Sequence, residues 1–219
     1  MPTSDRPATT VEWTTEKLRR GILSGAFPQN APLSQDDIAA RFGVSRMPVR
    51  EAIKRLAAEG LVLERPNRKA IVAALDAEDA EELFLIRAEL ECLAASRSLP
   101  LLSDAQLAAV DRAHRRLEEA DPGAYTRRHH RFHSALYAAA GPRLLALIDR
   151  HMMQAERYLC YERSRLPVTE EDLAEHRQLR DAALARDAEA AIRVLRPHIA
   201  EAGQAIAAAL AATEETHPS

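Results

Sequence analysis

Cysteine, lysine and long apolar runs are scarce in this sequence of 219 residues. Its two cysteines, Cys92 and Cys160, are too few for a disulfide framework, and we interpret both as buried small apolar residues of a protein from a reducing compartment. No uncharged apolar run approaches the ~20 residues that span a bilayer. Residues 1–10 lack the apolar segment of a signal peptide. We therefore expect a soluble, cytoplasmic protein with a disordered leader over residues 1–10 and no membrane partner.

Lysine is absent after Lys69, and the charge of the chain changes sign near the same place. Residues 1–73 hold 12 Lys and Arg against 8 Asp and Glu, a net charge of +4, whereas residues 74–219 hold 18 against 25, a net charge of −7. All eight histidines lie in the second part. A basic module followed by an acidic, histidine-bearing one indicates two domains with different partners.

Residues 34–62 have the pattern of two short helices joined by a tight turn. Ser34 is a suitable N-cap for the first helix, Gly43 can take the positive φ that ends it, and Ser45 can cap the second. Basic residues recur every four positions on one side of that second helix: Arg46, Arg50 and Lys54. Helix-turn-helix proteins present such a stripe to the major groove, and the alternative is a solvated charged face.

Two short β-prone runs follow, at residues 61–65 and 69–72, on either side of the turn-type tip Pro66-Asn67-Arg68. A basic hairpin tip beside a recognition helix suits contact with the minor groove or with phosphates. We therefore expect a wing.

Many positions of this region carry a recognisable pattern. They are Leu18-Arg19, Ile22, Ser24-Gly25, Pro32-Leu33-Ser34, Ile38-Ala39, Gly43-Val44-Ser45-Arg46, Pro48-Val49-Arg50-Glu51-Ala52 and Leu56 through Gly60-Leu61-Val62. The pattern resembles the GntR family of bacterial winged-helix repressors, which implies a winged helix-turn-helix DNA-binding domain over residues 11–74. The DNA-contacting residues that this implies are Arg19, Ser45, Arg46, Met47, Arg50, Lys54, Arg65, Asn67 and Arg68. Arg19 could equally be a solvated arginine. The family pattern has a basic residue near the start of the preceding helix, where this chain has Asp36, so we do not carry that contact over.

Alanine-rich amphipathic segments follow Val72 and predict an all-α bundle over residues 77–212, with a tail over residues 213–219. The expected helices span residues 77–98, 103–119, 122–140, 142–163, 169–185 and 187–212, because proline, glycine and aspartate interrupt the pattern between them. On the first of these helices we expect Leu83, Ile86, Leu90 and Leu93 to form a core stripe. The chain as a whole is therefore expected to be mostly α, with a winged helix-turn-helix domain before a helical bundle.

The bundle also carries a recognisable set of residues: Arg87-Ala88-Glu89-Leu90-Glu91, Phe132-His133, Leu136-Tyr137, Ala140-Gly141, Glu175-His176 and His198. These resemble the FCD-type effector domain of the FadR branch of GntR regulators. The resemblance implies that a divalent metal ion and a small effector bind inside the bundle and that the protein is a homodimer.

Four histidines are the candidate metal ligands. His129 and His133 are four residues apart and project from one face of a helix, while His176 and His198 lie on two other helices that can meet it at one level of a bundle. Any one of these histidines alone could be a surface residue or a hydrogen-bonded core residue. Many family members carry Asp in place of His129, and a set of four neutral nitrogens favours zinc, nickel or cobalt over manganese or magnesium. We expect zinc or nickel.

The other histidines are not expected to be ligands. His130 points about 100° away from its neighbour on the helix, His114 and His151 have no partner at a matching spacing, and His217 lies in the tail. The resemblance implies that Arg87 pairs with a carboxylate effector, and the alternative is a salt bridge with Glu91 one turn along the helix. Tyr137 is a second candidate for effector binding, through its hydroxyl, with core packing as the alternative.

The expected function is that of a DNA-binding regulator, a repressor, with a near-palindromic double-stranded operator and a small carboxylate effector. One alternative keeps the DNA-binding module but makes the metal purely structural, or replaces it with an acyl-type ligand. A metal-dependent enzyme is the other alternative. No His-Glu-x-x-His motif is present, and no Glu stands three residues before any of the four candidate ligands, so we do not expect an enzyme.

Overall fold

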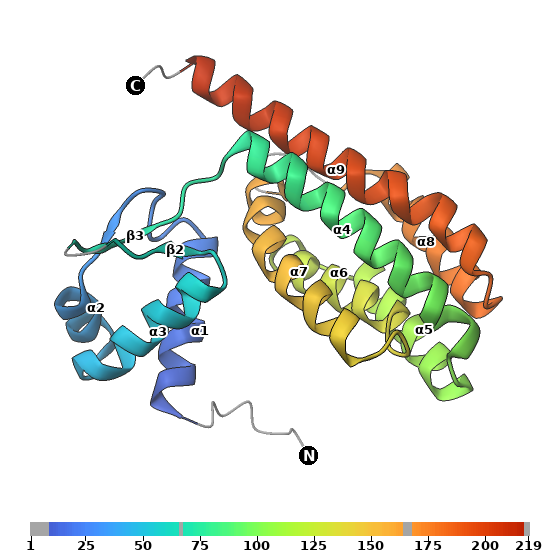
Figure 1. Cartoon of the computed structure of the whole chain (residues 1–219), viewed down its shortest axis with the longest axis horizontal. Helices are drawn as coiled ribbons and strands as arrows, with labels where there is room; N and C mark the ends of the chain where they lie inside the picture. The colour runs from blue at the N-terminus through green and yellow to red at the C-terminus, as the bar shows by residue number, and fades with distance from the viewer. Residues whose placement is uncertain (1–8, 66–67, 164–167, 217–219) are drawn as a thin grey trace. The chain divides into compact units, whose positions relative to one another are not determined.

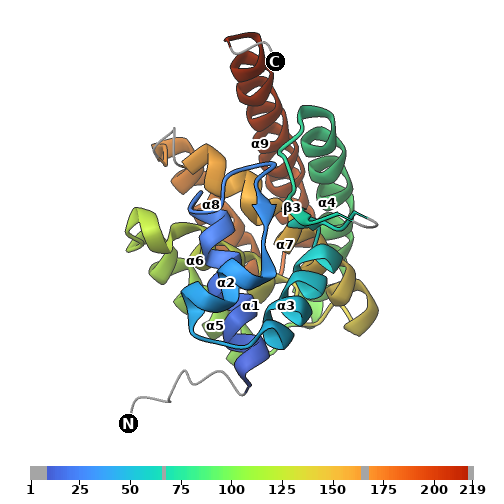
Figure 2. The same ribbon diagram turned by 90° about the vertical axis from the view of Figure 1, so that its left-hand side faces the viewer.

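The computed structural model describes residues 9–65, 68–163 and 168–216, and it divides the chain into two compact units, Met1–Leu75 and Asp76–Ser219 (Figure 1). The first unit contains three helices and a small sheet (Figure 2). Its elements are α1 (Thr10–Leu23), β1 (Pro32–Leu33), α2 (Gln35–Phe42), α3 (Arg46–Ala58), β2 (Val62–Leu63) and β3 (Ala70–Val72). The second unit is entirely helical within the described residues.

Local signals determine where α2 and α3 begin and end. The Ser34 hydroxyl accepts a hydrogen bond from the N–H of Asp37 at 3.4 Å, and Gly43 ends α2 with a φ of 68°. Ser45 has the extended backbone of an N-cap, but its side chain makes no capping hydrogen bond, so the expected side-chain cap at this position is wrong. Val49 and Ile53 are buried on the inner side of α3, which packs against α1.

The three strands form an antiparallel sheet in the order β1-β3-β2. Leu33 pairs with Ala70, and Leu63 pairs with Ile71. The two β-prone runs therefore form a hairpin after α3, as expected for a wing. The predicted tip at Pro66 and Asn67 lies outside the described residues, although the N–H of Arg68 donates to the carbonyl of Arg65 across it at 3.2 Å.

The second unit contains all six expected helices. They are α4 (Ala77–Ser98), α5 (Asp104–Glu118), α6 (Pro122–Leu136), α7 (Pro142–Arg163), α8 (Glu170–Leu184) and α9 (Ala188–Thr216), with a short 3-10 helix η1 at Leu99–Leu101. Two bounds differ from expectation by four residues, and the others by one residue at most. Helix α6 ends at Leu136 rather than residue 140, because the chain turns there toward Gly141, which has a φ of 99°. Helix α9 continues into the expected tail, since its alanine-rich end favours helix.

Helices α4 and α9 lie side by side along the unit (Figure 1). Gly203 permits their close approach, because a Cβ at this position would lie 2.4 Å from the Cβ of Phe84. Helix α7 packs against α4 as well. The predicted core stripe of α4 is consequently wrong in part. Leu83 is buried, but Ile86 and Leu93 remain 40% and 50% exposed because they lie on the side of α4 that neither neighbouring helix covers.

The two cysteines are free, with Cys92 buried and Cys160 half-buried. Burial raises the pKa of each thiol to about 11, aided by nearby carboxylates, so both stay protonated at neutral pH. They therefore act as packing residues. Among the helices of the described residues, none has both the length and the apolar character needed to cross a membrane.

Candidate DNA-binding surface and histidine centre

The outer side of α3 presents the cationic stripe that the sequence predicts. Arg46, Arg50 and Lys54 are all exposed, while the opposite side of the helix is buried in the first unit. Met47 is 60% exposed at the start of the same helix, next to the exposed Ser45. The beginning of α3 therefore offers hydroxyl, thioether and guanidinium groups together, which suits contact with base edges and phosphates.

Exposed ion pairs accompany this stripe. The Nε of Arg46 lies 3.0 Å from Oδ1 of Asp36, and Nζ of Lys54 lies 3.5 Å from Oε1 of Glu51. Exposed pairs of this kind contribute only ~0–1 kcal/mol, so a phosphate or a guanine edge can replace the carboxylate. Asp36, which stands where the family pattern has a basic residue, thus forms an exposed ion pair with Arg46.

Arg19 is placed differently from the stripe. Its Nη2 lies 2.7 Å from both carboxylate oxygens of Glu59, and its Nη1 lies 2.6 Å from Glu16. This network joins α1 to the end of α3 and uses the donors that a phosphate would need. We therefore leave Arg19 out of the proposed contact set.

Arg65 and Arg68, at the base of the wing tip, are exposed.

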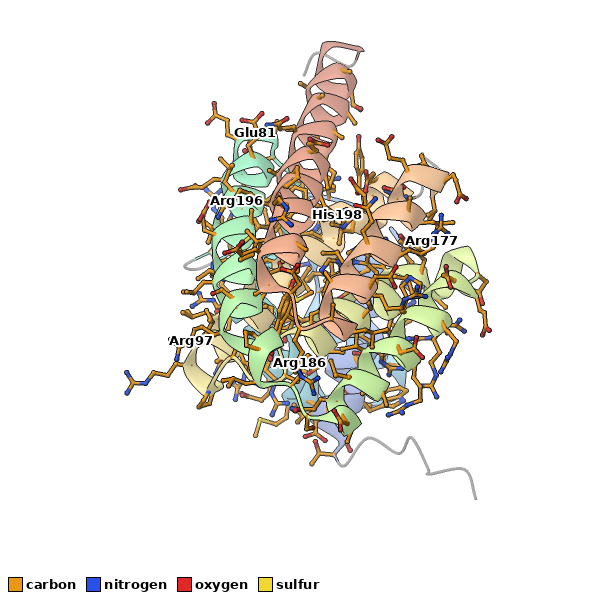
Figure 3. The ribbon with its side chains drawn as sticks, turned by 90° about the vertical axis from the view of Figure 1, so that its right-hand side faces the viewer. Glu81, Arg97, Arg177, Arg186, Arg196 and His198 are labelled. Atoms are coloured by element: carbon orange, nitrogen blue, oxygen red, sulfur yellow. The ribbon has the colours of Figure 1, made fainter. Side chains whose placement is uncertain are left out.

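Four imidazoles from three helices meet in the second unit. His129 and His133 come from α6, His176 from α8 and His198 from α9, and one nitrogen of each lies within 4.8 Å of the corresponding nitrogens of the others. Their ring centroids are 4.3 to 6.0 Å apart. Figure 3 shows His198 reaching from α9 towards α8. The structure thus brings together the four histidines that the sequence singled out.

Hydrogen bonds orient at least two of these rings. Nδ1 of His176 lies 2.5 Å from the carbonyl oxygen of Asp172, which can only accept, so this nitrogen carries the proton. Nδ1 of His198 lies 2.6 Å from a carboxylate oxygen of Glu175 and is protonated for the same reason. When such a ring is neutral, the proton on Nδ1 leaves the lone pair on Nε2, an arrangement typical of metal-ligating histidines.

Two ring nitrogens of the cluster lie close to each other. Nε2 of His133 lies 3.4 Å from Nε2 of His176, and two lone pairs at this separation repel unless a proton or a cation lies between them. Burial lowers the pKa of His133 to about 4, and burial together with the neighbouring imidazoles lowers the pKa values of His129 and His176 well below the ordinary value. These three rings are thus neutral at physiological pH, and a donor set of clustered imidazole nitrogens fits a divalent metal ion.

A buried network supports the cluster from α4. Nε of Arg87 donates to Oε1 of Glu91 at 2.9 Å, and the Tyr137 hydroxyl donates to Oε2 of the same carboxylate at 2.8 Å. Nδ1 of His133 lies 3.4 Å from that hydroxyl. Burial raises the pKa of Glu91, but Arg87, His133 and Tyr137 outweigh it and hold the pKa at about 2. Glu91 is consequently ionised and fixes the positions of all three partners.

A cavity of about 220 Å³ lies against the histidine cluster. His129, His176 and His198 line it, as does Arg87. Tyr137 is not among the described residues that line this cavity, and its hydroxyl is bound to Glu91. Its expected contact with an effector is therefore unsupported, whereas Arg87 both forms the salt bridge with Glu91 and faces the cavity.

His114, His130 and His151 lie outside the cluster, and His217 is outside the described residues. His130 is half-buried beside it, and burial lowers the pKa of His114, which is fully buried without a hydrogen-bond partner among the described residues. Sequence reasoning missed the supporting roles of Glu91 and Glu175. Both glutamates lie in segments that carry the family resemblance. Each supports a side chain of another helix, Tyr137 or His198, and a local sequence pattern does not show such a contact.

A winged helix-turn-helix unit with an exposed cationic recognition helix, followed by a helical bundle, defines a class of DNA-binding transcriptional regulators. Comparison with known families agrees with this class. Residues 10–72 match the bacterial regulatory proteins of the gntR family, and residues 82–201 match the FCD domain. The chain therefore belongs to the GntR family of transcriptional regulators, with an FCD-type second domain, and this family is not one of enzymes.

Two relatives show how far the similarity extends. The HTH-type transcriptional regulator BphR of Paraburkholderia xenovorans is 34% identical over 208 residues, which cover 86% of this chain and 82% of the relative. The HTH-type transcriptional repressor GlaR of Escherichia coli is 28% identical over 200 residues, which cover 83% and 89%. Both similarities extend over the two domains.

Solved structures agree. A putative GntR regulator from Rhodococcus sp. RHA1 is 29% identical with a TM-score of 0.73, covering 91% of this chain and 98% of the other. A GntR family member from Pseudomonas syringae pv. tomato is 34% identical with a TM-score of 0.60, covering 92% and 86%. The mostly helical fold expected from the sequence is confirmed.

Proposed function

We propose that the chain is a homodimeric repressor whose affinity for a near-palindromic operator is controlled by a small organic acid bound at a divalent metal ion. The observation that carries the proposal is the convergence of four imidazoles beside a cavity. A regulator of this kind acts where the chromosome lies, so we place it in the cytoplasm.

Operator recognition would use two N-terminal units, one from each subunit. Because a dimer imposes its own symmetry on the site, the operator would contain two related half-sites. The start of α3 would read base edges, and the wing would contact the backbone or the minor groove. The residues proposed for these contacts are Ser45, Arg46, Met47, Arg50, Lys54, Arg65, Asn67 and Arg68.

The metal ion would be held by His129, His133, His176 and His198. Four neutral ligands leave the ion its full charge, and imidazole nitrogen favours zinc or nickel over magnesium and manganese. When bound, such an ion supplies positive charge and an open coordination position for a carboxylate oxygen. The chain itself contributes the orientation of the rings through Asp172, Glu175 and Glu91.

The cavity favours a small anionic effector over the alternatives. Its volume of about 220 Å³ lies below the ~300–1,000 Å³ of pockets that hold drug-sized ligands, which argues against a bulky acyl ligand. A purely structural ion is usually enclosed by its ligands, whereas this cluster borders open space. Arg87 faces the same space and can pair with a carboxylate.

Metal analysis tests the centre directly. We expect one zinc ion per chain in protein incubated with zinc and then desalted, and none in the His133→Ala/His176→Ala double variant. Zinc should raise the melting temperature of the wild-type protein only, because a ligand that binds the folded state alone stabilises it. Equal zinc content in both proteins would contradict the proposed ligand set, and a double variant that is unfolded would indicate a structural ion.

Glu175 provides a finer test of how the rings are held. Glu175→Ala removes the carboxylate that accepts from Nδ1 of His198, and loss of such a partner typically lowers metal affinity by about 10-fold to 100-fold. Competition of the protein with a chromogenic zinc chelator measures this change. Glu189→Ala, which removes an exposed carboxylate near the start of α9, is the control and should leave zinc affinity unchanged.

The effector can be sought by thermal shift. Small carboxylic acids added to zinc-loaded protein should include some that raise its melting temperature, and these should have no effect on the His133→Ala/His176→Ala variant. A ligand that stabilises both proteins equally binds elsewhere.

A further inference from the structure

Basic residues are concentrated in one part of the acidic second unit. Residues 74–219 carry a net charge of −7, yet six of their 18 arginines fall within residues 112–131, which hold only three carboxylates. The two helices that contain these arginines, α5 and α6, pack against each other and are joined by residues 119–121. This segment therefore forms a local region of positive charge, and the proposed function does not use it.

A groove lies between these two helices, and we call it the arginine groove. Its volume is about 430 Å³. The described residues that line it are four arginines, one alanine and one glutamate: Arg116, Arg127, Arg128, Arg131, Ala113 and Glu119. Three of the arginines are exposed, and Arg128 is half-buried. None of these six residues lines the cavity beside the histidine cluster, so the groove is a separate feature of the second unit.

The guanidinium groups of the arginine groove are not neutralised within the described chain. Arg115, next to the groove residue Arg116, pairs with Asp111, and Glu118 pairs with Arg177 of α8. No carboxylate of the described residues lies within ion-pair distance of the four groove arginines. Four guanidiniums and the carboxylate of Glu119 give the groove a net charge of +3. Like charges gathered in this way repel one another, and an anion placed between them removes the repulsion.

One hydrogen bond orients a guanidinium between the two helices. Nη1 of Arg128 donates to the carbonyl oxygen of Arg116 at 2.6 Å. This carbonyl lies in the last turn of α5, where backbone carbonyls have no partner within their own helix. The other N–H groups of Arg128 have no acceptor among the described residues. Arg127 and Arg131 are four residues apart and project from one side of α6. The groove therefore offers free donors, one set of which is held in place.

The lining of the groove determines which ligand chemistry it suits. A guanidinium matches the geometry of a phosphate group and can donate to two of its oxygens at once. Ala113 is the one apolar residue of the described lining, so the groove offers little surface to a nucleobase or an acyl chain. A single phosphate carries a charge of about −2, which would leave part of the positive charge uncompensated. Two or more closely spaced phosphates compensate it fully.

We propose that the arginine groove is a second ligand site of this chain and that it binds an anion with two or more closely spaced phosphate groups. Free oligophosphates and the backbone of DNA both carry such groups. The site is separate from the effector cavity, and it needs no metal ion. The inference goes beyond the proposed function, because neither the recognition helix nor the histidine cluster depends on it.

Calorimetric titration of the full chain with sodium tripolyphosphate, with no metal ion added, tests the site. Arg127→Ala/Arg131→Ala should raise the dissociation constant by about tenfold or more, because it removes two charged donors from the groove. Arg143→Ala/Arg193→Ala is the matched control, since it removes two exposed arginines of α7 and α9 and changes the net charge equally. The control should remain within about threefold of the wild-type value. Circular dichroism should show native helicity in both variants, because the replaced side chains are exposed.

The recognition helix is another basic surface, and Arg46→Ala/Arg50→Ala separates it from the groove. This variant should bind tripolyphosphate within about threefold of the wild-type affinity. If it lost the binding while Arg127→Ala/Arg131→Ala kept the wild-type affinity, the anion would bind to α3 and the proposal would be overturned. Equal affinity in the wild type and in all the variants would overturn it as well.

The salt dependence of operator binding distinguishes the two sources of phosphate. If the backbone of DNA occupies the groove, Arg127→Ala/Arg131→Ala should reduce the slope of log affinity against log salt concentration by about 0.9 for each phosphate contact that it removes. An unchanged slope together with lost tripolyphosphate binding would assign the groove to a free oligophosphate. Fluorescence anisotropy with the selected operator at four or more salt concentrations measures the slope.

Discussion

Replacing Arg46 and Arg50 together with alanine should weaken operator binding by about 30-fold or more, since each guanidinium that reaches a guanine edge contributes ~1–3 kcal/mol. Both side chains are exposed on the outer side of α3, and the inner side of this helix holds it in the first unit. The loss should therefore be one of recognition and not of folding. Fluorescence anisotropy with an operator obtained by selection, at one fixed salt concentration, measures it.

Arg55→Ala is the matched control for this pair. Arg55 is also an exposed arginine of α3, but it lies at the other edge of the exposed side, about 180° around the helix from Arg46 and about 140° from Arg50. It should change operator affinity by no more than about threefold, as a distant charge does. Equal losses in Arg55→Ala and in the double variant would mean that the charge of the unit, and not the outer side of α3, determines binding.

Glu91→Ala should lower the free energy of unfolding of the protein by about 3–5 kcal/mol. Glu91 is fully buried, its carboxylate pairs with Arg87 and accepts from Tyr137, and its removal leaves a buried guanidinium without its counter-charge. Urea unfolding followed by circular dichroism measures the change. The loss is expected in metal-free protein, so it does not depend on the metal ion.

Two further variants test whether the loss of stability comes from the buried ion pair. Glu89 lies on the same helix as Glu91 and forms an exposed ion pair with Arg196 of α9. Glu89→Ala breaks this pair and should lower the free energy of unfolding by less than about 1 kcal/mol. An Arg87→Met/Glu91→Leu double replacement removes both charges and should recover most of the lost stability, since apolar residues of similar volume often replace a buried pair without loss. If Glu91→Ala lowered the free energy of unfolding no more than Glu89→Ala, the buried network around Glu91 would not be stabilising the bundle.

Local chemistry allowed the helices and the turn of the helix-turn-helix to be predicted from the sequence. Ser34 and Gly43 determine the ends of α2 through their own backbone and side-chain preferences, so no knowledge of the rest of the chain is needed. The same holds for Asp121 and Thr169, which cap α6 and α8. The four histidines were also recognisable, because His129 and His133 share a helical face and the family pattern adds the other two.

Contacts between distant segments could not be predicted. Arg19 reads as a free basic residue until the fold brings Glu59 from the end of α3 to its guanidinium. Tyr137 reads as a candidate ligand until α4 and α6 place its hydroxyl on Glu91. Ile86 and Leu93 fit a core stripe because periodicity shows that a side of a helix is apolar, but it does not show which side the neighbouring helices will cover.

The most direct test of a sensor at the histidine cluster is operator affinity with and without ligand. Zinc-loaded wild-type protein should bind the operator less tightly once a carboxylic acid that stabilises it is added, because in a repressor released by its effector each ligand weakens the binding of the other by the same factor. The His133→Ala/His176→Ala variant should bind the operator as tightly as the wild type, and adding the same acid should not change its operator affinity. An operator affinity that the acid changes equally in both proteins would contradict the account.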